Sequence, residues 1–264
     1  MIDGIKGLVR QALHGVGVEV HWRRPPAQPW VPPDPALLPD HHLYRPRYSP
    51  WLATEGEFHD TCDSIRPYTL VPPESCYVLQ CLARQATHCP GEFWECGVYK
   101  GGTAMLLERV IARSGNGATL RLFDTFEGLP DADAARDFHR RGEFADTSRE
   151  AVAARVAADF VRIHPGRIPD TFAGLEDRRI AFAHVDVDLY QSVLDCCRFV
   201  YPRLSAGGVM VVDDYGLRFC PGARKAVDEY FRDKPEEVLA LPTGQALVIA
   251  LPESRQHAGG SPGE

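Results

Sequence analysis

Two apolar stretches in the second half of the chain stand out, because each ends in a pair of acidic residues. Residues 180–190 read I-A-F-A-H-V-D-V-D-L-Y, and residues 207–215 read G-G-V-M-V-V-D-D-Y. Short apolar runs bounded by glycine or charge predict strands that are buried on both faces. The carboxylates at the ends of these two predicted strands belong to Asp186, Asp188, Asp213 and Asp214.

Hydrophobic spacing predicts the other elements as well. Apolar positions at helical spacing predict helices over residues 74–87, 103–114, 190–204 and 221–232. Thr147 or Ser148 is suited to cap a further helix that runs to about residue 160. Further strands are predicted over residues 92–96, 119–126 and 161–164, and an edge pair over 237–241 and 246–251. Strands that alternate with helices indicate an α/β fold with a mostly parallel sheet covered on both faces.

The two ends of the chain have a different character. Residues 1–20 carry a short amphipathic pattern, and residues 22–50 are rich in proline, which excludes a regular helix or a central strand there. The proline-rich segment is interpreted either as a linker or as an arm that wraps the domain or a partner subunit, since it also carries several tryptophans and tyrosines. We therefore expect an N-terminal arm or lid over residues 1–60, one domain over 61–252, and a disordered tail over 253–264.

Composition narrows the class of protein. The 264 residues are 44% hydrophobic and carry 36 acidic against 29 basic side chains, a formal net charge of -7. The absence of a basic stripe argues against a nucleic-acid partner, and no apolar run is long enough to span a membrane. The eight cysteines are scattered without zinc-finger spacing, and several, including Cys76, Cys81 and Cys96, fall in apolar elements. Together with the lack of a secretion signal, they are interpreted as buried thiols of a cytoplasmic protein.

The four carboxylates predict a cation. In an open α/β sheet the ligand crevice lies outside the carboxyl ends of the strands, so neighbouring strands would bring these side chains together there. Like charges so close repel one another, and oxygen ligands suit a hard divalent cation such as Mg²⁺. The alternative is that the four carboxylates belong to ordinary surface loops.

The turn after the first predicted strand reads E-C-G-V-Y-K-G-G-T and leads into a helix. Such a turn lets a ligand approach the backbone, and Glu95 and Asp124, at the tips of two strands, could accept hydrogen bonds from a ribose or an amine. These are the requirements of S-adenosylmethionine (SAM), for which Gly97 and Thr103 complete the expected contacts and Gly166 is expected near the adenine. The alternative is an ordinary strand-to-helix turn with solvent-facing acids.

A family resemblance rests on five motifs that occur in order. They are E-C-G-V-Y-K-G-G-T, F-D-T-F-E-G-L-P, H-V-D-V-D-L-Y-Q-S, G-G-V-M-V-V-D-D-Y-G and C-P-G-A-R-K-A-V-D-E-Y-F. Together they resemble the macrocin O-methyltransferase family over about residues 66–251. The upstream segment R-P-Y-T-L-V-P-P-E-S fits as well and assigns Thr69 to the cofactor site. The resemblance implies a class I SAM-dependent methyltransferase (Rossmann-like) fold with a seven-stranded sheet, and a Mg²⁺-dependent O-methyltransferase that acts on sugars of antibiotics.

The resemblance also implies roles for the acidic residues. Asp186, Asp213 and Asp214 match what look like the family's metal carboxylates, and Asp186 is assigned to the cofactor as well. Asp188 matches the position proposed for a general base, although it could instead orient a metal ligand. The chemistry agrees, because a cation makes a hydroxyl easier to deprotonate and a carboxylate beside it can take the proton.

Other polar residues near these motifs keep two interpretations. Tyr190 and Tyr215 either line the acceptor pocket or pack in the core, and His139 belongs either to a lid over the cofactor or to a solvated loop. His184 is interpreted as a buried histidine with satisfied hydrogen bonds rather than as a base.

Two alternatives to a sugar O-methyltransferase stay open: a catechol-type or other phenolic O-methyltransferase, and a non-catalytic SAM-binding protein. An NAD-dependent enzyme would need a glycine fingerprint that the chain lacks. The expected partners are a small-molecule acceptor and further copies of the chain in a homodimer or larger homo-oligomer.

Overall fold

The computed structural model describes residues 49–252. The amphipathic segment over residues 1–20, the part of the predicted arm up to residue 48 and the predicted tail over 253–264 lie outside the described residues.

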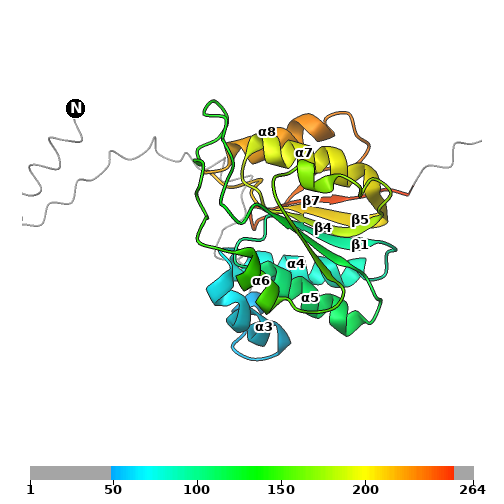
Figure 1. The fold of residues 1–264 in the computed structure, drawn as a ribbon. Coiled ribbons are helices and arrows are strands. Elements are labelled where there is room, and N and C mark those ends of the chain that lie inside the picture. The colour runs from blue at the N-terminus through cyan, green and yellow to red at the C-terminus, as the bar shows by residue number, and fades with distance from the viewer. Residues whose placement is uncertain (1–48, 253–264) are drawn as a thin grey trace, which may run out of the picture. The chain divides into compact units, whose positions relative to one another are not determined.

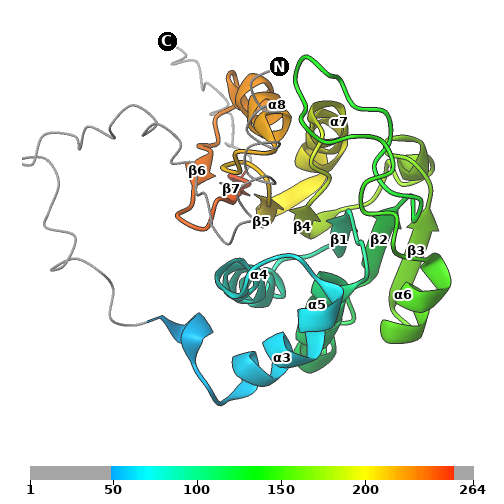
Figure 2. The ribbon, with the colours of Figure 1, turned by 90° about the vertical axis from the view of Figure 1, so that its left-hand side faces the viewer.

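The described chain is built around one seven-stranded sheet with the order β3-β2-β1-β4-β5-β7-β6 (Figures 1 and 2). The strands are β1 (Glu92–Cys96), β2 (Leu120–Asp124), β3 (Val161–Pro165), β4 (Ile180–Val185), β5 (Leu204–Val212), β6 (Leu239–Ala240) and β7 (Ala246–Ile249). Strands β3, β2, β1, β4 and β5 run parallel, while β7 pairs antiparallel with β5 and with β6. The mostly parallel α/β sheet predicted from the hydrophobic pattern is confirmed, and so is the antiparallel edge pair.

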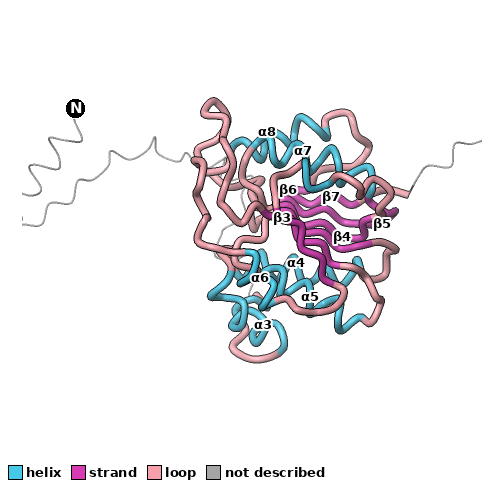
Figure 3. Tube along the Cα trace, viewed as in Figure 1, coloured by secondary structure: helices cyan, strands magenta, loops and turns pink. Residues whose placement is uncertain are grey.

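Helices cover both faces of the sheet, as Figure 3 shows with the strands in magenta between two cyan layers. The α-helices are α3 (Glu57–Ile65), α4 (Pro73–Ala86), α5 (Gly102–Ser114), α6 (Arg149–Arg155), α7 (Tyr190–Val200) and α8 (Pro221–Phe231). Short 3-10 turns cover Pro50–Leu52, Arg66–Tyr68, Asp170–Phe172 and Tyr201–Arg203. Helices α7 and α8 lie on one face, and α3, α4, α5 and α6 lie on the other. Within residues 49–252, no helix is long and apolar enough to cross a membrane.

Two predicted helices are shorter in the structure. Helix α6 starts as expected, because the Ser148 hydroxyl accepts a hydrogen bond from the backbone N–H of Ala151, but it stops at Arg155, where Val156 turns into the core. Helix α7 ends at Val200 because Pro202 has no backbone N–H with which to continue it, and β5 therefore starts at Leu204.

The expectation for the cysteines was partly wrong. All eight are free thiols and six of them are buried, but Cys81 is exposed and Cys89 is half-buried. Cys81 lies on the outer face of α4, opposite the stripe formed by Cys76, Leu79 and Ala83 that packs on the sheet.

The turn after β1 lies unusually close to the end of β4. A Cβ atom on Gly97 would lie 1.7 Å from the backbone carbonyl oxygen of Asp186, and the φ angle of Gly97 is +86°. The backbone N–H of Gly97 also donates to the carbonyl of Phe123 at 2.8 Å. Only glycine allows the ends of β1 and β4 to approach in this way, and this approach brings the turn next to the acidic residues.

We expect Gly97→Ala to destabilise the fold by more than about 4 kcal/mol, because the clash is with backbone and cannot relax through a side chain. Gly115→Ala is the matched control, since Gly115 also has a positive φ of +64° but open space around it. The free energy of unfolding of the control should fall by only about 1–2 kcal/mol, because of backbone strain alone. Urea unfolding followed by circular dichroism measures both, and equal losses would contradict the steric explanation.

A half-buried ion pair joins the first strands at the amino-terminal edge. The Arg121 guanidinium donates to both Glu92 carboxylate oxygens, at 2.6 and 2.9 Å, and the Trp94 indole N–H donates to one of them at 3.1 Å. Burial alone would raise the pKa of the Glu92 carboxyl, but the hydrogen bonds from Arg121 and Trp94 outweigh it and hold the pKa below its ordinary value. The ionised carboxylate therefore stabilises the fold.

Glu92→Gln should lower the free energy of unfolding by about 1.5–3 kcal/mol at neutral pH, the range for hydrogen bonds to charged groups. A carboxyl group whose pKa is lower in the folded than in the unfolded protein stabilises the folded state at pH values above its unfolded pKa of about 4.3. This contribution disappears as the pH falls through the folded pKa. The difference between wild type and variant should therefore shrink in acid. Denaturant titrations across this pH range test it, with the exposed Glu237→Gln as the control that changes little at any pH.

Candidate active site

A cavity of about 340 Å³ opens at the carboxyl-terminal edge of the sheet. The loops that follow the strands gather at this edge, including the long segment between β2 and α6, which is green in Figure 1 and pink in Figure 3. The volume of the cavity is at the lower end of the range typical of small-molecule sites. The predicted site residues that line it are Thr69, Gly97, Thr103, Asp124, His139, Gly166, Asp186, Asp188, Asp213 and Asp214.

Three predicted site residues do not line the cavity. Glu95 is fully buried and faces His184 rather than the crevice. The Tyr190 hydroxyl donates to Glu229 at 2.6 Å, and the Tyr215 hydroxyl donates to Asp228 at 2.7 Å. Both tyrosines are therefore tied to α8 by their hydroxyl groups, as packing residues are.

Asp124 holds the glycine-rich turn after β1. One of its carboxylate oxygens accepts the backbone N–H groups of Val98 and Tyr99, at 2.7 and 2.9 Å, and the other accepts that of Phe126 at 2.7 Å. A carboxylate offers about four acceptor positions, so roughly one remains for a ligand. Asp124 thus shapes the turn as well as facing the cavity.

The carboxylate cluster forms because β4 and β5 are neighbouring parallel strands. Val185 pairs with Val212, so Asp186 and Asp213 follow the strands at the same level, and the Asp213 N–H donates to the Val185 carbonyl at 2.9 Å. One Asp214 carboxylate oxygen accepts the backbone N–H of Asp188 at 3.0 Å, and Asp188 has a positive φ of 54°. The expectation that the two acidic strand ends lie side by side is confirmed.

Burial and mutual repulsion make this cluster unfavourable without a compensating charge. Burial raises the pKa of Asp186 well above its ordinary value, and the charges of Asp214 and Asp213 raise it further. The pKa of Asp214 is also raised well above its ordinary value, mainly by burial and then by the charges of Asp188 and Asp213. Burial also raises the pKa of Asp188, while His139 opposes the shift. Carboxylate oxygens are the kind of ligand that a hard divalent cation binds.

His184 links the cluster to the interior. Its Nδ1 lies 3.0 Å from Glu95 Oε1 and its Nε2 lies 3.4 Å from Asp213 Oδ1. Burial disfavours the charged imidazole, but the hydrogen bonds with Asp213 and Glu95 outweigh burial and raise the pKa of His184 above its ordinary value. Gln245 donates to the same Asp213 oxygen at 2.7 Å. Because both ring nitrogens of His184 face carboxylates, the ring orients Asp213, as expected of a buried histidine with satisfied hydrogen bonds.

Two ligand groupings exist among the described residues. His184, Asp186 and Asp213 offer atoms that all lie within 4.8 Å of one another, and so do His139, Asp188 and Cys220. Asp214 belongs to neither close grouping, so the three carboxylates assigned to a metal are not all at ligand spacing in this structure. Of the three, Asp186 and Asp213 are close enough to hold a cation together in this structure.

Sequence reasoning missed several residues that shape the site. Cys220 contacts Asp188, and Gln245 donates to Asp213. Asp137 caps α7 from a distant loop by accepting the Tyr190 N–H at 2.8 Å. Cys220 stood in one of the recognised motifs, but no sequence pattern pointed to Gln245 or Asp137.

Comparison with known proteins agrees with the geometry. The family model described as Macrocin-O-methyltransferase (TylF) matches residues 75–238. Demethyldecarbamoylnovobiocin O-methyltransferase of Streptomyces niveus is 33% identical over 154 residues, which are 53% of this chain and 58% of that protein. A second relative, from Streptomyces olivaceus, is the 8-demethyl-8-(2,3-dimethoxy-alpha-L-rhamnosyl)-tetracenomycin-C 4'-O-methyltransferase. It is 32% identical over 154 residues, which are again 53% of this chain and 58% of that protein. The match thus spans little more than half the length of each of these curated relatives.

The structure is similar to that of the O-methyltransferase NovP, with a TM-score of 0.64 and 27% identity over 70% of this chain and 83% of that one. This similarity confirms the class I SAM-dependent methyltransferase fold expected from the resemblance. The family match contains the turn after β1, both acidic strand ends and α8. The chain therefore belongs to the macrocin O-methyltransferase family.

Proposed function

We propose that this chain is a SAM-dependent and divalent-metal-dependent O-methyltransferase. We propose further that it methylates a hydroxyl of a sugar, such as a deoxysugar, on an antibiotic or another secondary metabolite.

The observation that carries the proposal is the acidic cluster at the ends of β4 and β5. Asp186, Asp188, Asp213 and Asp214 all line the same cavity, and the pKa of three of them is raised by burial and by their neighbours. A non-catalytic SAM-binding protein would gain nothing from such an unfavourable arrangement. A divalent cation held there by Asp186, Asp213 and Asp214 would supply positive charge that favours the deprotonated form of an acceptor hydroxyl.

The remaining predicted residues suit the cofactor. Gly97 and Gly166 directly follow β1 and β3, Asp124 ends β2, and Thr103 lies in the first turn of α5. These four residues line the cavity, as does Thr69 in the loop before α4. The free acceptor position of Asp124 is available to a ribose hydroxyl, and Gly97 lines the same cavity. SAM, when bound, supplies the methyl group, and the chain's task is to hold the acceptor oxygen in line with it. Such positioning can contribute about 7–11 kcal/mol to a rate enhancement.

Asp188 is the group we assign as general base. It lies beside Asp214 on the cavity side, and its raised pKa brings it nearer to neutral pH, where proton transfer is most efficient. It would accept the proton of the acceptor hydroxyl as the oxygen forms its bond to the methyl carbon.

The sugar acceptor rests on the relatives. The Streptomyces olivaceus enzyme is named for a rhamnosyl group, and the Streptomyces niveus enzyme for demethyldecarbamoylnovobiocin. No contact in the described residues favours a phenolic acceptor over a sugar. The small-molecule partner, the homo-oligomer and the cytoplasmic location stay predictions.

The first test is methyl transfer itself. Incubation with SAM, Mg²⁺ and a panel of glycosylated antibiotics, free or nucleotide-linked sugars and catechols should give a singly methylated sugar product by mass spectrometry. Removal of metal with EDTA should reduce turnover by about 10²–10³-fold, because the cation supplies several kcal/mol. Added Mg²⁺ should restore the activity. Full turnover in metal-free buffer would exclude the metal role, and SAM binding without any product would favour the non-catalytic alternative.

Asp188→Asn tests the base. The variant should lose about 10²–10⁴-fold in kcat, the usual contribution of general base catalysis, while its affinity for SAM in calorimetry stays that of the wild type. Asp233→Asn is the matched control, because Asp233 is highly exposed and pairs only with Lys234 among the described residues. Normal turnover in Asp188→Asn would remove Asp188 from the mechanism.

A further inference from the structure

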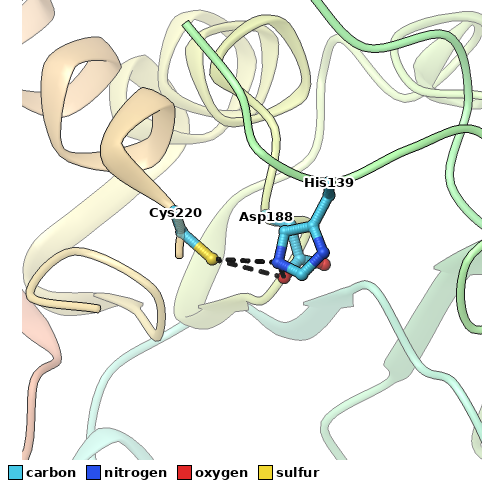
Figure 4. A group of neighbouring side chains, drawn as sticks. All are labelled: His139, Asp188 and Cys220. Atoms are coloured by element: carbon cyan, nitrogen blue, oxygen red, sulfur yellow. Dashed lines mark hydrogen bonds and ion pairs between the residues drawn. The ribbon is translucent and has the colours of Figure 1, made fainter. Parts of the chain in front are cut away.

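A second ligand cluster lies beside the acidic one, formed by His139, Asp188 and Cys220 (Figure 4). His139 Nε2 lies 3.5 Å from Asp188 Oδ1, Cys220 Sγ lies 3.5 Å from the same oxygen, and Cys220 Sγ lies 3.5 Å from His139 Nε2. The three atoms thus form an equilateral triangle. All three residues line the cavity.

This triangle has the dimensions of one face of a zinc site. Zinc bonds of about 2.0–2.1 Å to nitrogen, 2.3 Å to sulfur and 2.0–2.2 Å to oxygen, at tetrahedral angles, separate the ligands by about 3.3–3.6 Å. As a hydrogen bond, by contrast, 3.5 Å between nitrogen and oxygen is long. The spacing therefore suits a shared tetrahedral ion better than a direct contact between His139 and Asp188.

His139 is held in the orientation that a ligand needs. Its Nδ1 lies 2.6 Å from Glu143 Oε2, so Nε2 is the nitrogen that faces Asp188. A histidine that binds a metal commonly gives its other N–H to a carboxylate in this way. The loop is also anchored two residues earlier, where Asp137 Oδ1 accepts the Tyr190 N–H and sits so close to Gly222 that a Cβ there would lie 2.1 Å from it.

The other two ligands are equally well placed. The backbone N–H of Asp188 donates to Asp214, which holds the backbone of Asp188 in place. Cys220 is 3% exposed and directly precedes α8, where its carbonyl accepts the Ala223 N–H at 3.1 Å. Three separate segments, each with its own anchor, converge on one point.

We propose that His139, Asp188 and Cys220 form a second metal site, selective for Zn²⁺ or a similarly soft divalent ion, with a fourth position open to the cavity. Sulfur and imidazole ligands favour such an ion, whereas the carboxylates of Asp186, Asp213 and Asp214 favour Mg²⁺. An ion at the second site ties up Asp188, so it inhibits methyl transfer. Binding does not depend on the proposed function, but the inhibition does.

Cobalt is the probe for the site, because a thiolate bound to Co²⁺ gives a charge-transfer absorption that carboxylate ligands cannot give. The full chain, saturated with Mg²⁺, should develop this band with one equivalent of Co²⁺, and Zn²⁺ should abolish it. Cys220→Ser should lose the band, while the matched control Cys81→Ser, which alters an exposed thiol on α4, should keep it. Absence of the band in wild type, or its survival in Cys220→Ser, would overturn the proposal.

A second variant covers the case in which Cys220→Ser does not fold, which thermal unfolding without metal would reveal. His139→Gln should weaken Co²⁺ binding at least tenfold, because losing even an outer partner of a metal ligand costs about 10–100-fold. Unchanged cobalt affinity in His139→Gln would contradict the site.

Inhibition is measured separately, as the activity with Zn²⁺ relative to the zinc-free activity of the same variant at saturating Mg²⁺. Wild type and Cys81→Ser should lose activity on addition of Zn²⁺, and Cys220→Ser should resist. Equal inhibition of Cys220→Ser would show that zinc acts elsewhere and overturn the inhibitory role. A cobalt band in a chain without any methyl transfer would leave the site standing and contradict the proposed function alone.

Discussion

The structure around the cavity depends on one electrostatic constraint, the placement of four carboxylates at the ends of two adjacent buried strands. The pairing of β4 with β5 sets Asp186 beside Asp213, and the residues that follow add Asp188 and Asp214. Burial and repulsion both oppose ionisation of such a group. His184 and Gln245 offset part of the repulsion from the interior side by contacting Asp213, and the proposed cation would offset the rest from the cavity side.

The contacts that His184 makes on the interior side of the acidic cluster leave one buried oxygen without a partner in the described part of the chain. His184, on β4, contacts Glu95 on β1 and Asp213 directly after β5, so one buried imidazole links the ends of three neighbouring strands. The other Glu95 oxygen, Oε2, is buried and has no hydrogen-bond partner among the described residues. A buried polar atom without a hydrogen-bond partner is unfavourable. The network therefore orients Asp213 rather than adding to stability.

The sequence predicts what local pattern decides. Apolar runs predict β1, β4 and β5, and the hydroxyl at Ser148 predicts where α6 begins, because these depend on residues close in sequence. The placement of Asp137 on the amino end of α7 could not be predicted, since it depends on a close approach at Gly222 some eighty residues further on. The sequence could not predict the direction of the Glu95 side chain either. A side chain at the end of a strand can face the crevice or the interior, and only the contact with His184 in the structure shows that Glu95 faces the interior. The acidic cluster was predictable because two local patterns and one rule of sheet topology suffice.

Asp188 is the residue at which the two proposed ion sites meet. Through its backbone it is bonded to Asp214 of the hard, all-oxygen cluster, and through its side chain it contacts His139 and Cys220, which are softer ligands. A base must be free of a tightly held cation to take a proton, so a zinc ion at the second site would block the side chain that we propose as the base. Because the two clusters differ in ligand type and share this single residue, the identity of the bound metal decides whether the proposed base is available.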